Sequence, residues 1–187
     1  MRVISGNFDA NDLYQKLLES SIRFVSFRLR SEKEFRDFLL KKLSRSSVIP
    51  AKAGIQSSDA PLIDRVLTRL RELGYVDDAK FVSWWVDQRK SYKPKGVRLI
   101  AQELKAKGIS DDLVQSLLVK RKDYFTCGRS ENSTDDEVVL ARRAVERKLP
   151  LWNKLPKLEQ KRKLYGFLGR RGFDSDTIQR VILDSVV

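Results

Sequence analysis

One local pattern occurs twice in the chain, as LKAKGISDDLV at residues 104–114 and as LGRRGFDSDTI at residues 168–178. Each copy runs from a leucine through basic residues to a glycine, and then through an apolar residue to an acidic or hydroxyl residue. Glycine commonly ends a helix in the left-handed conformation, and Asp or Ser caps the start of the next helix. Both stretches therefore predict a helix, a tight turn and a second helix.

The segments that precede these turns repeat as well. DDAKFVSWWVDQRK at residues 77–90 aligns with DDEVVLARRAVERK at residues 135–148, with an acidic start and a basic end in each. Apolar residues at helical spacing elsewhere predict nine helices in total, and no segment alternates as a strand would. A three-helix unit of roughly 45 to 55 residues buries only a marginal core by itself, so we expect it to share apolar surface with its neighbours. We predict an all-α fold: an elongated array of three tandem three-helix repeats.

Composition changes along the chain suggest the boundaries of these repeats. Apolar spacing predicts a first helix from Asp12 to about Arg30, and Ser31 with Glu34 has the form of a capping box at the start of the next helix. A later stretch is rich in Ser, Ala, Gly and Pro and reads as an inserted loop. The predicted parts are a flexible tail (1–12), a first repeat (13–74) with the inserted loop (44–61), a second repeat (75–122), a linker (123–134) and a third repeat (135–187).

The composition excludes most familiar catalytic chemistry. The chain has 187 residues, no histidine and one cysteine, Cys127, so Ser/His and Cys/His pairs, histidine metal sites and internal disulfides are absent. No glycine-rich phosphate loop is present. Acidic doublets at 77–78, 111–112 and 135–136 could hold a metal, but each stands at a predicted helix start, which favours capping. We expect no enzymatic activity, no metal and no cofactor.

Positive charge is the chain's other distinctive property. Lys and Arg number 38 against 25 Asp and Glu, which gives a net charge of +13 and a pI near 10.0. Such charge favours binding to a polyanion through phosphate contacts and counterion release, whereas the alternative is a solvated basic surface. The cations concentrate in two runs, and the candidate binding residues are Arg89, Lys90, Arg98, Lys105, Lys107, Arg142, Arg143, Arg147, Lys148, Arg162, Lys163, Arg170 and Arg171.

Aromatic residues interleave with these charges: Trp84, Trp85, Tyr92, Trp152 and Tyr165. Exposed aromatic rings beside cations can stack on nucleobases or dock on a protein partner. Trp85 lies on the same helix face as Phe81, which favours a place in the core. The pattern leaves both roles open for Trp84 and Trp152.

Three longer runs carry a family resemblance: RLRELGYVDDAKFVSWWVDQR from Arg69, GVRLIAQELKAKGIS from Gly96 and FLGRRGFDSDTIQRVI from Phe167. They resemble the RecX family of bacterial RecA regulators, over nearly the whole chain outside the inserted loop. The resemblance implies a helical protein that binds the RecA filament on single-stranded DNA. It also implies that the protein modulates, and mainly inhibits, filament growth, ATPase, strand exchange and coprotease activity, in DNA repair, recombination and the SOS response.

A second function remains open on the same residues, namely a basic helical DNA- or RNA-binding module that acts directly on nucleic acid. Dependence on a RecA filament distinguishes the two hypotheses. The sequence shows no export signal and no stretch of about 18 uninterrupted apolar residues, so we expect a cytoplasmic monomer with no membrane partner.

Overall fold

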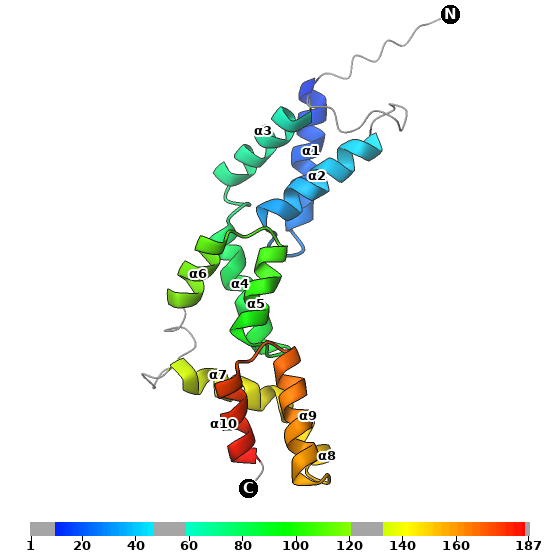
Figure 1. The fold of residues 1–187 in the computed structure, drawn as a ribbon. Coiled ribbons are helices and arrows are strands. Elements are labelled where there is room, and N and C mark those ends of the chain that lie inside the picture. The colour runs from blue at the N-terminus through cyan, green and yellow to red at the C-terminus, as the bar shows by residue number, and fades with distance from the viewer. Residues whose placement is uncertain (1–9, 47–58, 121–132, 186–187) are drawn as a thin grey trace, which may run out of the picture. The chain divides into compact units, whose positions relative to one another are not determined.

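The structure, a computed structural model, describes residues 10–46, 59–120 and 133–185 (Figure 1). All regular structure in these ranges is helical, which confirms the predicted all-α class. None of the described helices has the length and hydropathy to cross a membrane. The helices are α1 (Ala10–Val25), α2 (Glu32–Ser46), α3 (Asp59–Glu72), α4 (Asp78–Ser91), α5 (Val97–Ala106), α6 (Asp111–Lys120), α7 (Ser133–Val145), α8 (Leu149–Trp152), α9 (Lys157–Arg170) and α10 (Ser175–Ser185).

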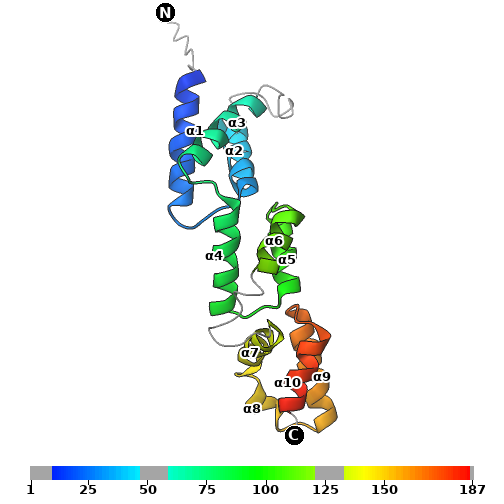
Figure 2. The same ribbon diagram turned by 90° about the vertical axis from the view of Figure 1, so that its left-hand side faces the viewer.

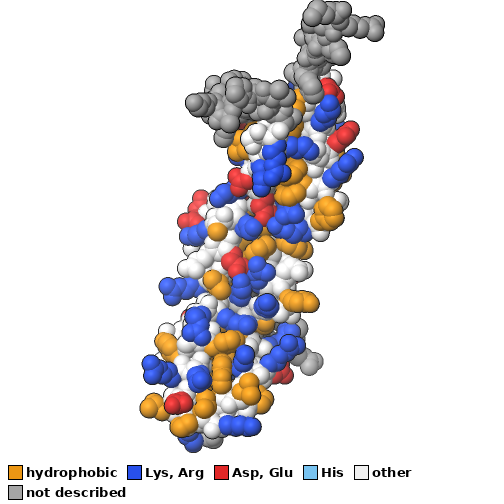
Figure 3. Space-filling view, turned by 90° about the vertical axis from the view of Figure 1, so that its right-hand side faces the viewer, with side chains coloured by type: hydrophobic (Ala, Val, Ile, Leu, Met, Phe, Trp, Pro, Cys, Tyr) orange, Lys and Arg blue, Asp and Glu red, His pale blue; other side chains and the backbone are white. Residues whose placement is uncertain are grey.

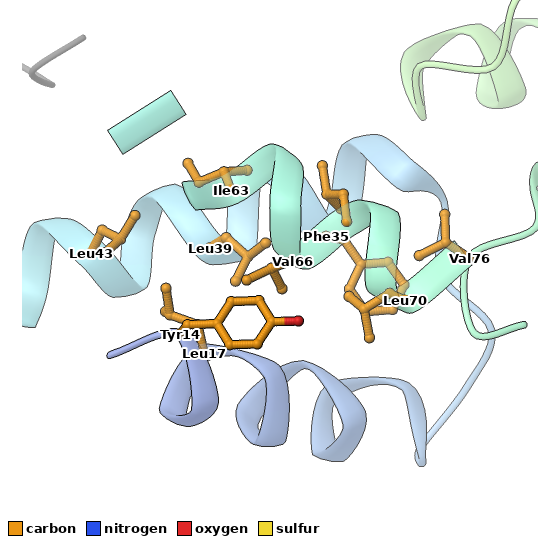
Figure 4. Packing of buried hydrophobic residues seen from close by; sticks show 10 residues of the cluster. Tyr14, Leu17, Phe35, Leu39, Leu43, Ile63, Val66, Leu70 and Val76 are labelled. Carbon is orange, nitrogen blue, oxygen red and sulfur yellow. The ribbon is translucent and has the colours of Figure 1, made fainter. Parts of the chain in front are cut away.

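The chain divides into two compact units, Met1–Phe81 and Val82–Val187, and the boundary falls inside α4. The first unit has a core built by α1, α2 and α3. Figure 4 shows Leu17 from α1, Leu39 from α2 and Val66 from α3 converging, and each is at most 1% exposed. A side chain buried this fully contributes roughly 2 kcal/mol of transfer free energy. The first three helices therefore pack around a core of their own.

The turn between α1 and α2 differs from the prediction at one end. Ser31 Oγ accepts a hydrogen bond from the backbone N–H of Glu34 at 3.3 Å, so the predicted cap of α2 is confirmed. Helix α1, however, ends at Val25 and does not continue to Arg30. Phe24 stacks on Phe38 of α2 with ring centroids 4.3 Å apart, and the Arg30 guanidinium lies 4.0 Å from the Phe24 ring. These contacts turn the chain back toward α2 before it reaches Arg30, the predicted end of α1.

Three predicted connections lie mostly outside the described residues. Helix α1 begins at Ala10, within the predicted tail, and residues 1–9 are not described. Helix α2 continues to Ser46 and α3 begins at Asp59, so the two ends of the predicted loop 44–61 are helical, and residues 47–58 are not described. Helix α7 begins at Ser133, inside the predicted linker, and Cys127 lies outside the described residues.

The second unit contains α5 to α10 and the larger part of α4 (Figure 2). In its last repeat, α7, α9 and α10 share a core in which Val145, Leu164 and Val181 are completely buried. The helical spacing of the apolar residues Val138, Ala141, Ala144, Val145 and Leu149 predicts a single helix. That prediction is wrong, because α7 ends at Val145 and the separate short helix α8 follows. Pro150 lies in the first turn of α8, and its ring would clash with the carbonyl of the residue four positions earlier in a continuous helix.

Helix α9 buries a different face from the one that its apolar spacing predicts. The helical spacing of Leu158, Leu164, Tyr165 and Leu168 predicts that all four face the core. Leu158 and Tyr165 are instead 81% and 47% exposed. The buried positions are instead Gln160, Leu164 and Leu168, spaced four residues apart along one face. The opposite face of α9 is therefore available to solvent.

The repeated glycine turns adopt one geometry. The left-handed φ angles are +75°, +82° and +80° at Gly74, Gly108 and Gly172. After the second turn, the N–H of Ile109 reaches back to the carbonyl of Leu104 at 3.1 Å, and after the third, Phe173 makes the same bond to Leu168 at 3.3 Å. The predicted helix ends are confirmed, because the glycine conformation and the returning hydrogen bond are both local.

The second and third repeats meet at the segment that joins α4 to α5. The N–H of Gly96 donates to the carbonyl of Arg171 at 2.9 Å, just after α9. The N–H of Val97, at the start of α5, donates to the Glu137 carboxylate on α7 at 3.2 Å. These bonds connect the two repeats within the second unit.

Candidate nucleic-acid interface

All thirteen predicted binding residues belong to the second unit. Helix α4 carries Arg89 and Lys90, α5 carries Arg98 and Lys105, and Lys107 follows α5. The third repeat holds the rest: Arg142 and Arg143 on α7, Arg147 and Lys148 before α8, Arg162, Lys163 and Arg170 on α9, and Arg171 after α9.

Arg89 takes part in a half-buried network around Glu103. Its Nε donates to Glu103 Oε2 at 2.7 Å, Trp85 Nε1 donates to the same oxygen at 3.0 Å, and Lys95 pairs with the other carboxylate oxygen. The Arg89 guanidinium also lies 4.1 Å from the Trp85 ring, which is buried as predicted. Burial raises the pKa of Glu103, but the hydrogen bonds from Lys95 and Arg89 outweigh it, and the pKa lies below its ordinary value. The network holds α4 to α5.

Two further predicted cations are paired with carboxylates. Lys105 lies 2.9 Å from Asp111, and Arg142 pairs with Asp184 on α10. The remaining exposed cations have no ion-pair partner among the described residues: Arg98, Arg143, Arg147, Lys148, Arg162, Lys163 and Arg170. This second group can meet an external anion without first giving up a partner within the described ranges.

A pocket of about 620 Å³ lies where the α4–α5 connection meets the end of α7, and we call it the junction pocket. Tyr92, at its edge, is 87% exposed. Arg171 is fixed in the wall, since its Nη1 donates to the Pro94 carbonyl at 3.2 Å and its guanidinium lies 4.5 Å from the Phe167 ring. Burial lowers the pKa of Arg171, yet a guanidinium remains charged near neutral pH. The lining residues are Ser91, Tyr92, Lys93, Pro94, Arg143, Ala144, Glu146, Arg147 and Arg171.

A second pocket, of about 550 Å³, lies between α8 and the outer face of α9, and we call it the α9 pocket. Helix α8 contributes an aromatic wall, and α9 contributes residues that recur every three or four positions and therefore share one face. The lining residues are Trp152, Glu159, Arg162, Lys163, Gly166 and Arg170. Figure 3 shows Lys and Arg side chains around hydrophobic ones over this part of the chain, with few acidic side chains between them.

Both pockets attract anions because cations predominate in their walls. The junction pocket combines Lys93, Arg143, Arg147 and Arg171 with Glu146, and the α9 pocket combines Arg162, Lys163 and Arg170 with Glu159. Arg170 and Arg171 are adjacent in sequence but line different pockets, so the pockets flank the end of α9. Lys93 was not among the predicted binding residues, although it lies in the same basic run. Only the folded connection brings it beside α7.

The acidic doublet at 77–78 supplies two helix caps, whereas at α6 the Oγ of Ser110, and neither carboxylate of the 111–112 doublet, accepts the N–H of Leu113, at 3.4 Å. Asp77 Oδ1 accepts the N–H of Lys80 at 2.9 Å at the start of α4, and this bond lowers the pKa of Asp77. Asp78 caps α2 instead, accepting the N–H of Glu32 at 2.9 Å, and burial raises its pKa. Within the described ranges, no three His, Cys, Asp or Glu side chains gather as metal ligands would. The side chains of Asp135 and Asp136 lie outside what is described.

These features define a class: an all-helical repeat protein with one cationic pocket where its second and third repeats meet and another on its third repeat. Family models agree with this description, since the RecX second three-helix domain matches residues 77–118 and the RecX third three-helix domain matches residues 135–182. The chain belongs to the RecX family of regulatory proteins.

Individual relatives agree with this assignment. Regulatory protein RecX of Bacillus subtilis strain 168 is 30% identical over 167 residues, which cover 89% of this chain and 54% of that protein. The Geobacillus strain WCH70 protein of the same name is 30% identical over 173 residues, covering 92% and 54%. This chain therefore spans just over half the length of these relatives.

Solved structures show the same fold at lower identity. The crystal structure of RecX from Lactobacillus salivarius aligns with a TM-score of 0.65 and 21% identity, over 93% of this chain and 97% of that one. A second crystal structure of regulatory protein RecX aligns with a TM-score of 0.67 and 18% identity, over 91% and 73%. These likenesses support the all-α array of three-helix repeats.

Proposed function

We propose that this chain regulates RecA recombinase. It binds the RecA filament on single-stranded DNA and modulates, mainly by inhibition, filament growth, ATPase, strand exchange and coprotease activity. It acts in the cytoplasm as a monomer, in DNA repair, recombination and the SOS response, with neither a cofactor nor catalysis of its own. Membership of the RecX family supports the regulatory role, and the cationic pockets support a partner that carries phosphates.

The junction pocket is the observation that carries this proposal. Two repeats contribute cations to it, with Lys93 from the α4–α5 connection and Arg143 and Arg147 from the end of α7. A phosphate chain in the pocket would contact both repeats at once. Each neutralised phosphate releases condensed counterions, so the attachment is independent of base sequence and weakens steeply as salt rises.

The ion pairs of the second unit separate the predicted binding residues into two groups. We assign phosphate contact to the exposed cations without ion pairs in the described residues, and a structural role to Arg89, Lys105 and Arg142. Removing Arg89 would leave the half-buried Glu103 carboxylate with one cation fewer, so we expect this change to lower stability. Lys90, Lys107 and Arg171 are assigned to neither group alone, and they remain among the proposed binding residues.

Regulation requires more than binding. A ligand that binds two filament states equally cannot shift the balance between them, and a tenfold preference corresponds to about 1.4 kcal/mol. A chain that contacts neighbouring RecA protomers, and the DNA between them, meets a different spacing in each state. Its preference for one spacing would then bias the filament.

The proposal is tested by a pair of double variants that remove equal charge from one repeat. Arg143→Ala with Arg147→Ala removes two cations from the lining of the junction pocket. Lys157→Ala with Lys161→Ala removes two exposed lysines of α9 that line neither pocket. Inhibition of the DNA-dependent ATPase of RecA is measured. We expect the concentration that gives half-maximal inhibition to rise at least about tenfold for the pocket variant and less than about threefold for the control. Equal losses would assign the effect to net charge, and unchanged inhibition by a folded pocket variant would remove the pocket from the proposal.

A second experiment separates filament binding from direct action on nucleic acid. The chain is sedimented with RecA on single-stranded DNA, with naked single-stranded DNA and with naked duplex, at physiological salt. We expect far greater retention on the filament. Equal or better retention by naked duplex would favour a helical module that acts directly on DNA or RNA.

A further inference from the structure

The α9 pocket combines an aromatic wall with cations that have no ion-pair partner in the described residues. The Trp152 ring is held edge-on against Phe167, with centroids 5.5 Å apart and an interplanar angle of 75°. Phe167 is itself packed against the core of the third repeat and lies 4.5 Å from the Arg171 guanidinium. Trp152 is thus oriented by the fold before any ligand arrives.

The outer face of α9 forms the rest of the pocket. Arg162, Lys163 and Arg170 lie around Gly166, which has no side chain to fill the space between them. A Cβ on Gly166 would meet only Arg170 Nη1, at an ordinary 3.6 Å, so helix packing does not require glycine at this position. The missing side chain leaves the floor of the pocket open.

The lining chemistry selects among the anions that the pocket could hold. Guanidinium and ammonium groups bind phosphate, and an indole face binds a flat aromatic ring. A phosphoserine or phosphothreonine supplies the phosphate without the ring, whereas a nucleotide supplies both. Glu159 is the one carboxylate in the lining, and it can accept a hydrogen bond from an N–H group on a base.

We infer that the α9 pocket is a binding site for one nucleotide, with its base against Trp152 and its phosphate on Arg162, Lys163 and Arg170. The inference deepens the proposed function, because a nucleotide unit of single-stranded DNA has this chemistry. A free nucleotide shares it. The volume of about 550 Å³ lies within the usual range for ligands of that size.

The test compares probes that share phosphates but differ in bases. The full chain is titrated with a thymidine oligomer, an abasic oligomer of equal length and free deoxythymidine monophosphate. Isothermal titration calorimetry gives the affinities of every variant, and tryptophan fluorescence of the wild type is recorded alongside. Base stacking on one aromatic residue contributes about 1 to 3 kcal/mol, so Trp152→Leu should weaken thymidine-oligomer binding about 5- to 150-fold. Binding of the abasic oligomer should change less than about twofold. Trp152→Phe should restore most of the affinity.

Variants on α9 test the other walls. Arg162→Ala with Arg170→Ala should weaken both oligomers alike and reduce the salt dependence, because phosphates are common to both. Lys161→Ala, about 180° around α9 from Arg170 at 100° per residue, is the single-charge control and should change neither appreciably. Gly166→Gln should fill the pocket and weaken thymidine-oligomer binding while raising helix stability, since glycine is the poorer helix former. If Trp152→Leu does not fold, Gly166→Gln therefore still tests the site.

The outcomes discriminate the two possible sources of the nucleotide. Trp152-dependent quenching by the oligomer alone identifies a strand, and equal quenching by the monophosphate identifies a free nucleotide. Equal affinities of wild type, Trp152→Leu and Gly166→Gln for the thymidine oligomer would overturn the inference. RecA inhibition is assayed separately, so a chain that stacks a base without inhibiting RecA refutes the proposed function and leaves the pocket assignment intact.

Discussion

Gly96 lies so close to Gly172 that it has no room for a Cβ atom, and Leu99 leaves no room for one at Gly172. A Cβ on Gly96 would overlap the carbonyl of Gly172, and a Cβ on Gly172 would lie 2.6 Å from the backbone nitrogen of Leu99. The φ angle of Gly96 is −71°, which any residue adopts, so space alone requires glycine there. The contact joins the start of α5 to the turn after α9, beside the junction pocket.

Replacing Gly96 by Ala should therefore separate these two backbones. We expect Gly96→Ala to lower the free energy of unfolding by about 1 to 3 kcal/mol, the usual cost of overpacking. Gly169→Ala is the control, because a Cβ at that position of α9 would meet nothing within 4 Å and Ala favours the helix. Urea unfolding followed by circular dichroism measures both. Equal stability of the two variants would contradict the close-packing argument.

Glu103 should stabilise the second unit in a pH-dependent way. Its pKa is lowered in the folded state, so its contribution is present above the ordinary glutamate pKa of 4.5 and is lost as the pH falls through the folded value. We expect Glu103→Gln to cost about 1 to 3 kcal/mol at pH 7, because bonds to Arg89 and Lys95 lose their charge. The difference in the free energy of unfolding between variant and wild type, measured by urea unfolding, should be smaller at pH 3 than at pH 7. A gap independent of pH would show that the carboxylate charge is not the cause.

Glu137 should behave in the opposite sense. Burial raises its pKa, nearby Asp174 raises it further, and the hydrogen bond from Val97 opposes both. Its folded state holds the proton more tightly, so stability is lost as the pH rises from the ordinary value through the raised one. Glu137→Gln keeps an acceptor for the Val97 N–H and removes the buried charge. We expect added stability at pH 7 and none at pH 4, measured by thermal unfolding at both.

The cap that Asp78 supplies to α2 crosses a wide sequence gap. Asp78→Ala should remove the acceptor for the Glu32 N–H and cost about 1 kcal/mol, while Asp78→Asn should keep it and match the wild type. Protection of the Glu32 amide from hydrogen exchange provides the local readout. Fast exchange in the Ala variant alone is the expected result, and equal exchange in both would reject the cap.

Short-range rules account for the features that could be predicted. The left-handed turns at Gly108 and Gly172, the Ser31 cap and the Asp77 cap each depend on residues within five positions. The prediction for Asp78 was incomplete because its partner is the N–H of Glu32, on another helix. Periodicity also placed Leu158 in the core, although the buried stripe of α9 follows other residues.

The sequence alone determined the helical class, the repeated helix–glycine–cap unit and the excess of positive charge, because propensity, capping and net charge are local or additive properties. Only the tertiary structure decided which cations are available. Arg142 and Arg143 are neighbours in sequence, yet one pairs with Asp184 of α10 and the other lines the junction pocket. Ion pairs and pockets form between segments far apart along the chain, so no spacing rule distinguishes a structural arginine from one that can bind a phosphate.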